Sequence, residues 1–206
     1  MILKKICYTL SIFILSSSLQ AGSHQENLVQ EDFGTAIKHV EKKNYFEAFK
    51  IFSGLAEIGV PEAQYNLALL YSNGLGVPVN YKLTLYWSWQ SHLNGHQAAM
   101  KQVTNTYDLI NENLRNEVAQ LIIDELLENA YAGDKVSPLK LGKTYLGLFV
   151  EAQNQPAYLW LSISQAYGDV AASELLDVAA NQLTLEEVLS QQEQAQKIFD
   201  EIIFDD

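Results

Sequence analysis

Two histidines are the first residues whose spacing suits chemistry. His92 and His96 lie four positions apart, and on one helical face such a pair can hold a metal ion. Gly95 stands between them, however, and is expected to end the helix that carries His92. No further histidine or carboxylate completes a ligand set. The sequence therefore predicts a structural junction at this point, with no metal site.

The other titratable and nucleophilic groups are isolated or lie on helix surfaces. His24 and His39 stand alone, and no serine lies in a G-x-S-x-G motif. The glycine-containing segment 74–76 follows a helix rather than a strand, and no G-K-[ST] continues it, which disfavours a phosphate loop. The acidic pairs at 124–125 and 186–187 are interpreted as solvated helix faces. We predict no catalytic residue and no cofactor.

Residues 1–22 differ in character from the rest of the chain. Lys4 and Lys5 precede the apolar run Ile6–Leu15, and small residues follow, an order typical of a secretory signal peptide. The alternative is an uncleaved anchor, which needs about 17–25 apolar residues to span a bilayer. The run is too short for that. We expect cleavage after Ala21 or Gly22, export to the periplasm or the extracellular space, and no membrane insertion afterwards.

Charge and cysteine content argue against nucleic-acid binding and against a disulfide bond. The formal net charge is −12, and it becomes more negative once the two lysines of the leader are removed. A nucleic-acid partner requires a cationic face, and Arg115 is the only arginine, so we predict no nucleic-acid binding. Solubility explains the charge, with a basic patch on a protein partner as the alternative. The single Cys7 lies in the leader, so we expect no disulfide in the mature protein.

From Glu31 onward, apolar residues recur at spacings of three and four, which predicts helices, and no stretch alternates as a strand does. Gly59 is placed to end one helix and Pro61 to begin the next. Thr184 and Glu187 fit a capping box. The pattern predicts about ten helices, over residues 30–43, 45–58, 61–73, 80–94, 97–110, 112–131, 136–146, 155–167, 169–182 and 185–203.

A motif and a duplication organise this pattern. Residues 61–99 contain A-x-Y-N-L-A-x-L-Y-x-x-G-x-G-V-P-x-x-Y, then a tryptophan and G-H-x-A-A. This motif resembles the Sel1-like repeat, a relative of the tetratricopeptide repeat. A degenerate copy follows about 73 residues later, so that Trp87 corresponds to Trp160. In that copy Gly147-Leu148-Phe149 replaces Gly74-Leu75-Gly76, and we expect its loop to differ in shape.

The resemblance implies an all-α fold, a right-handed α-solenoid of stacked antiparallel helix pairs. It would form one domain, 23–206, after the signal peptide 1–22, with repeat units of about 31–60, 61–96, 97–133 and 134–169 and a helical tail, 170–206. It also implies a non-enzymatic adaptor that binds an unidentified partner protein or peptide. The alternatives are a regulatory or accessory subunit of a cell-wall enzyme and, in third place, a hydrolase in its own right.

Two surfaces are candidates for binding. By analogy with tetratricopeptide repeats, the first helix of each pair lines a concave face. The expected inner positions are Glu62, Tyr65, Leu69, Ser72, Val136, Leu139, Lys143 and Leu146. These side chains would suit a peptide or helix in the groove. An equally weighted alternative is that they pack between neighbouring repeats.

The second candidate surface is an aromatic stripe. Tyr86, Trp89 and Leu93 fall at i, i+3 and i+7, on one side of a helix. Aromatic residues are enriched at binding hot spots. The alternative is that the helix expected at 97–110 covers them. The second copy has Leu159, Ser162 and Ala166 at these positions, so the aromatic surface would belong to one unit only.

Overall fold

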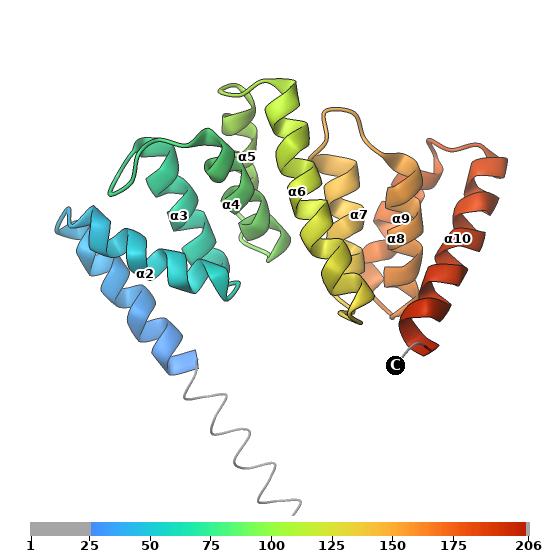
Figure 1. Cartoon of the computed structure of the whole chain (residues 1–206), viewed down its shortest axis with the longest axis horizontal. Helices are drawn as coiled ribbons and strands as arrows, with labels where there is room; N and C mark the ends of the chain where they lie inside the picture. The colour runs from blue at the N-terminus through green and yellow to red at the C-terminus, as the bar shows by residue number, and fades with distance from the viewer. Residues whose placement is uncertain (1–25, 205–206) are drawn as a thin grey trace, which may run out of the picture.

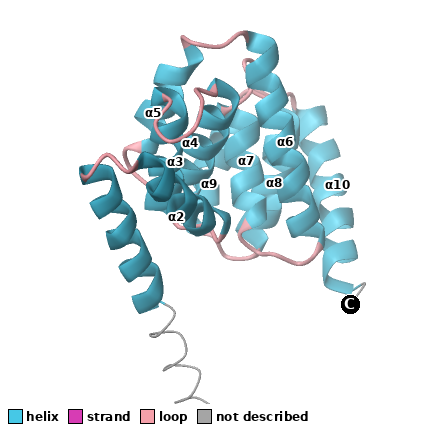
Figure 2. Cartoon of the chain, turned by 60° about the vertical axis from the view of Figure 1, so that its left-hand side comes forward, coloured by secondary structure: helices cyan, strands magenta, loops and turns pink. Residues whose placement is uncertain are grey.

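The computed structural model describes residues 26–204, and within this range the chain is helical with no strand (Figure 2). The predicted signal peptide and its cleavage site lie outside the described residues. Within 26–204, no helix is both long enough and apolar enough to cross a membrane. A helix over residues 26–41 is followed by α2 (Tyr45–Glu57), α3 (Pro61–Asn73), α4 (Tyr81–Leu93), α5 (Ala99–Tyr107), α6 (Glu112–Tyr131), α7 (Ser137–Gly147), α8 (Asn154–Ala166), α9 (Val170–Ala180) and α10 (Leu185–Phe204).

The helices stack side by side into an arch (Figure 1). Helix α3 packs on α4 and α7 packs on α8, while α2 packs on α3 and α6 on α7. Helix α8 also contacts α9 and α10. Helix α4 likewise contacts both α5 and α6, so each helix buries its apolar face against a helix one or two places away along the chain, as a solenoid requires. The predicted all-α solenoid is confirmed.

The helix ends follow the expected local chemistry. Gly59 has φ +84° and ends the helix before it, while Pro61 is the first residue of α3. The Thr184 backbone N–H donates to Glu187 Oε2 at 2.8 Å, and the Glu187 N–H donates to Thr184 Oγ1 at 3.3 Å. These reciprocal bonds confirm the capping box. Helix α5 is shorter than expected, because the Leu109 N–H bonds the Thr106 carbonyl three residues back and tightens the chain into a turn.

Within residues 26–204, three apolar clusters run along the stack. The first joins the helix 26–41 to α2 and α3 and contains Phe52 and Leu67. The central one spans α4 to α8 and α10, with Trp89 and Trp160. The third lies among α7, α8 and α9 and contains Leu161. Because each cluster draws on several helix pairs, no pair has a core of its own.

Candidate functional site

The α3 part of the predicted inner face is half open to solvent. Glu62 is exposed, while Tyr65, Leu69 and Ser72 are half-buried. The Tyr65 ring stacks on the imidazole of His96, with ring centroids 4.5 Å apart and planes 20° from parallel. This contact fixes the ring of Tyr65 but leaves part of it accessible. An aromatic side chain held in this way can serve as a rigid anchor for a bound chain.

The α7 part of the inner face has a different character. Val136 is exposed at the start of the helix, and Lys143 is half-buried. Leu139 and Leu146 are half-buried against the third cluster, which α9 shares. These two leucines therefore contribute to packing between neighbouring helices, which was the alternative considered for the whole set.

A polar bridge connects the α3 and α7 parts. Gln64, beside Tyr65, accepts a hydrogen bond from Asn94 Nδ2 at 2.9 Å and donates to the Ala56 carbonyl at 3.1 Å. Asn94 Oδ1 in turn accepts from Lys140 Nζ at 2.7 Å. Burial lowers the pKa of Lys140, and the nearby carboxylate of Asp134 opposes that shift. The bridge thus ties the end of α4 to both helices that carry the inner face.

The two histidines have separate structural roles. His92 lies against the indole of Trp89, with ring centroids 5.1 Å apart, whereas His96 stacks on Tyr65. Burial, and then the charge of Lys143, lower the pKa of His92, and both favour the neutral imidazole. Over residues 26–204, no group of three His, Cys, Asp or Glu side chains is arranged to hold a metal ion.

The predicted aromatic stripe is not a surface. Trp89 is 1% exposed and Leu93 is 7% exposed. The indole N–H of Trp89 donates to Thr144 Oγ1 of α7 at 3.0 Å, and the same ring shares a core cluster with Val103 of α5. The surface hypothesis is therefore wrong for these residues. Helix α5 was expected to be the alternative cover, and α7 adds to it.

The third stripe residue belongs to a partly buried polar cluster that the sequence did not indicate. The hydroxyl of Tyr86 donates to Glu125 Oε2 at 2.8 Å, and Gln90 Nε2 also contacts that oxygen at 3.3 Å. Burial, with the hydrogen bond to Glu125, raises the pKa of Tyr86 to about 12. Burial also raises the pKa of Glu125. The interpretation of 124–125 as a solvated pair is thus wrong for Glu125, because α4 covers it, and holds only for Asp124.

The only arginine of the chain is used internally. Arg115 Nε donates to the Leu148 carbonyl at 2.7 Å and Nη2 donates to the Phe149 carbonyl at 2.8 Å. Its guanidinium also lies 3.8 Å from the ring centroid of Tyr107. Sequence reasoning treated Arg115 only as a charge. Its position four residues after Asn111, which caps the start of α6, places it in the first turns of that helix.

No family model and no curated protein matches this chain. Several solved structures are similar to it, including the following two. A Sel1 repeat protein from Oxalobacter formigenes has 22% identity and a TM-score of 0.39, with 84% of this chain and 74% of that one covered. The second is c5321, described as a protective antigen present in uropathogenic Escherichia coli strains and displaying an SLR fold. It has 19% identity and a TM-score of 0.32, with 84% of this chain covered and 45% of its own. The chain thus spans less than half of the second protein. Because both TM-scores are low, the fold rests on the helix arrangement of this chain.

Proposed function

We propose that this chain is a non-enzymatic protein–protein interaction module that works in the bacterial envelope or the secreted fraction and binds a partner protein or peptide on its inner face. The observation that carries the proposal is the mixed lining of that face. Tyr65 and Leu69 on α3 and Lys143 on α7 are all half-buried. The polar bridge through Asn94 joins the two helices.

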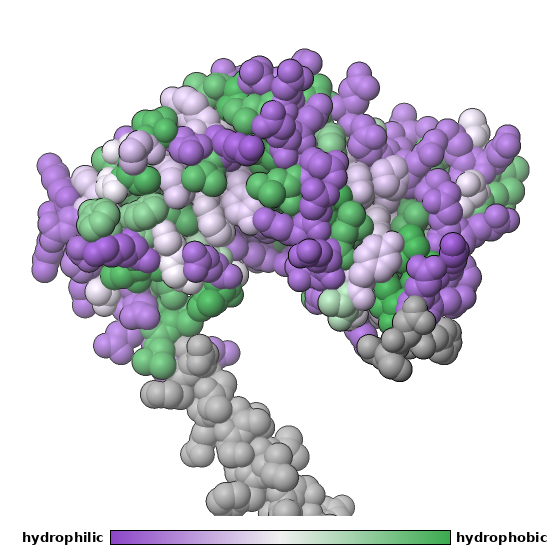
Figure 3. All heavy atoms as spheres, in the orientation of Figure 1, coloured by the Kyte–Doolittle hydropathy of each residue, from purple (hydrophilic) through white to green (hydrophobic). Residues whose placement is uncertain are grey.

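This lining supports a bound chain more than a small substrate. Aromatic and aliphatic groups on α3 would contact apolar side chains of the partner, and Lys143 would meet a carboxylate or a main-chain carbonyl. The space-filling view is hollowed along its lower edge, between the part formed by α2 and α3 and the lower end of α6 (Figure 3). Helical repeat proteins bind their partners along an extended concave surface of this kind. The export part of the proposal is supported by the pattern of residues 1–22.

A crosslinking pull-down tests the proposal. Tagged mature protein would be incubated with envelope and secreted fractions, beside a Tyr65→Ala, Leu69→Ala double variant. Leu109 and Leu121, which are 53% and 41% exposed and are not among the inner-face positions, give the matched control, Leu109→Ala with Leu121→Ala. Circular dichroism would establish that all three proteins fold.

The expected result is a partner that the wild-type chain and the control capture and the inner-face variant loses. Capture of the same protein by all three would contradict binding at this face. Absence of any partner specific to the wild-type chain would contradict the adaptor role itself.

A further inference from the structure

The last helix carries a strip of two leucines, two glutamines and a phenylalanine, of which the phenylalanine packs partly on the central cluster while the two leucines are exposed. Leu185, Leu189, Gln192, Gln196 and Phe199 recur at the spacing of one helical face on α10. Leu185 is 75% exposed and Leu189 is 52% exposed. We name this strip, together with Ser162 and Ala166 of the adjacent α8, the end face. Terminal repeats of a solenoid usually have polar outer surfaces, so exposed leucines here need a reason.

The duplication identifies what the end face corresponds to. Helix α10 (Leu185–Phe204) is offset by 73 residues from α6 (Glu112–Tyr131), and α8 has the same offset from α4. The α6 residues that match the strip include Ala119, Ile123 and Leu126, all buried in the central cluster. Asn116, which matches Leu189, accepts a hydrogen bond from the Val150 N–H in the loop after α7. The end face is therefore the counterpart of the surface on which α7 and its loop pack.

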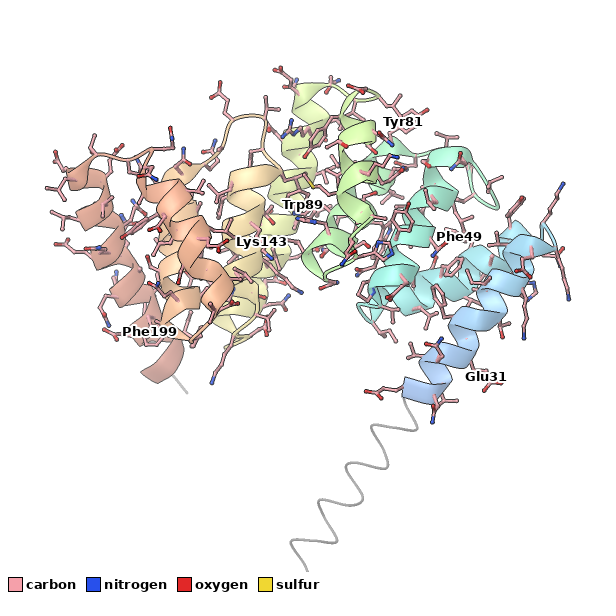
Figure 4. All side chains as sticks on the ribbon, turned by 180° about the vertical axis from the view of Figure 1, so that it is seen from behind. Glu31, Phe49, Tyr81, Trp89, Lys143 and Phe199 are labelled. Atoms are coloured by element: carbon pink, nitrogen blue, oxygen red, sulfur yellow. The ribbon has the colours of Figure 1, made fainter. Side chains whose placement is uncertain are left out.

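A cavity marks the place where the two surfaces differ most. At the positions of Trp89 and Leu93, α8 has Ser162 and Ala166. A cavity of about 290 Å³ opens there between α8 and α10, with buried Ile163 and Ala195 among its lining residues. Phe199 also lines it and is labelled near the lower end of α10 in Figure 4.

Helix α8 therefore lacks the bulky side chain that α4 supplies at this position. In the central stack, Trp89 projects from α4 to α7, where it meets Thr144 and Gly147. On the end face the small residues are on this chain, so an occupying helix must itself supply the bulky side chain. Gln192 and Gln196 stand at the rim as exposed polar residues. An apolar floor with a polar rim suits an interface that is also stable when it is empty.

The charges around the end face indicate which kind of helix would bind there. Helix α7, which covers the corresponding surface of α6, contains Lys140 and Lys143 and no carboxylate. The end face is flanked by Glu186 and Glu193, which line the same surface depression as Leu185 and Leu189. A second copy of this chain would bring a net charge of −12 to an acidic surface, which opposes association.

We infer that the end face binds a basic amphipathic helix of a partner protein, which inserts a large apolar side chain into the cavity between α8 and α10. The helix would lie on α8 and α10 as α7 lies on α4 and α6. This surface is separate from the inner face, so the inference does not depend on where the proposed adaptor binds its main partner.

The probe for the test comes from the chain itself. A stapled, fluorescein-labelled peptide with the sequence of residues 136–150 would carry Thr144→Trp, which supplies the missing bulky side chain. Its binding to the full mature protein would be followed by fluorescence anisotropy. A peptide with the natural threonine, and one with both lysines changed to glutamate, are the matched controls. We expect each control to bind at least about tenfold more weakly, which corresponds to about 1.4 kcal/mol.

Two protein variants decide the site. Ser162→Trp with Ala166→Leu fills the cavity with the residues of the first unit, and Leu189→Glu changes a position that is 52% exposed. Both should weaken binding by at least about tenfold, while Tyr65→Ala with Leu69→Ala should leave it unchanged. The inference is overturned by no saturable binding of the Thr144→Trp peptide, or by binding that neither end-face variant weakens. It is also overturned if sedimentation shows a concentration-dependent dimer that Leu189→Glu abolishes, because the occupant would then be a second copy.

Discussion

The loop after α3 and the loop after α7 occupy equivalent places in the two copies but are held by different kinds of contact. After α3, residues 74–80 turn with Gly74 at φ +65° and Gly76 at φ +75°. A Cβ on Gly76 would lie 2.4 Å from the carbonyl oxygen of Tyr45, so this loop meets the start of α2 backbone to backbone. After α7, Leu148 continues in a right-handed conformation, and Arg115 binds the carbonyls of the turn.

The preceding helix explains the difference. In the first copy the chain breaks at residues 42–44, with Lys43 at φ +59°, and α2 begins only at Tyr45. In the second copy α6 runs unbroken from Glu112, a position that an offset of 74 residues aligns with Lys38. Helix α6 therefore has about two additional turns, and these carry Arg115. A short helix leaves room for a close backbone approach that needs glycine, whereas a long one supplies side chains that bind the loop.

The largest effect is expected from Gly76→Ala. The substitution adds a left-handed strain of about 1–2 kcal/mol and a clash with the backbone of Tyr45 that costs about 1–3 kcal/mol. We expect the free energy of unfolding, measured by urea denaturation, to fall by about 3 kcal/mol. Gly59→Ala is the matched control, because Gly59 has φ +84° but no atom within 4 Å of the added Cβ. Equal losses in the two variants would show that the approach to α2 contributes nothing.

In the second copy the corresponding test is Arg115→Ala. The substitution leaves the carbonyls of Leu148 and Phe149 without their charged donor. Hydrogen bonds to charged groups contribute about 1.5–3 kcal/mol, so we expect a loss of about 2 kcal/mol in urea denaturation. Arg115→Lys should recover only part of it, because an ammonium cannot reproduce the planar set of donors.

Lys82→Ala serves as a reference for removal of a cation. Lys82 forms an exposed ion pair with Glu117 at 3.3 Å, and such pairs contribute about 0–1 kcal/mol. If Arg115→Ala lowered the free energy of unfolding no more than Lys82→Ala does, the two loops would differ in shape but not in how side-chain contacts stabilise them.

The sequence predicted where helices begin and end better than it predicted which helices pack together. The periodicity and the helix-end residues placed α3 and the start of α10 correctly, since both depend on local chemistry. The change from Gly76 to Phe149 indicated a different loop, and the dihedral angles confirm it. Periodicity also put Trp89 on an apolar face, but it cannot say which distant helix covers that face. The contact between Trp89 and Thr144 spans 55 residues, so only the assembled stack reveals it.

The site was predictable to the same limited degree. The inner-face positions of α3 and α7 follow from the repeat register, and their role as a binding surface stays a prediction. The role of Arg115 depends on a loop 32–34 residues away along the chain. The end face was also missed, because Ser162 and Ala166 read as ordinary surface residues until α10 is placed beside them.

A smaller effect is expected where the two copies pair core residues of different size. Ala68 and Ser88 of the first copy correspond to Gly142 and Leu161 of the second. A Cβ on Gly142 would lie 2.4 Å from Leu161 Cγ, so the small residue on α7 makes room for the large one on α8. We expect Gly142→Ala to lose about 1.5 kcal/mol and the double variant with Leu161→Ala to lose less than the sum of the single losses. Additive losses in a double-mutant cycle would contradict this compensation.

The smallest expected effect concerns how α3 and α7 begin. Helix α3 begins after Val60, which has no side-chain cap, whereas Asp134 at the matching position of the second copy accepts a hydrogen bond from the Ser137 N–H at 2.9 Å. Burial opposes ionisation of Asp134, but the bonds from Ser137 and Val136 and the charge of Lys140 outweigh it and lower its pKa below 3.8. Asp134 lies in the turn before α7, and Asp134→Ala should cost about 1 kcal/mol because the N–H groups of Val136 and Ser137 lose their side-chain acceptor.

The pH dependence of that loss separates the hydrogen bonds that Asp134 accepts from the effect of its charge. A carboxyl whose folded pKa is depressed stabilises the protein above its unfolded pKa, and the contribution disappears as pH falls through the folded value. Melting temperatures would be compared from about pH 6 to about pH 3 for the wild type, Asp134→Ala and Asp134→Asn. The asparagine keeps an acceptor oxygen but does not titrate, so it should retain part of the stability and show a shallower acid dependence than the wild type. Parallel curves for all three proteins would mean that α7, like α3, begins without help from a side-chain charge.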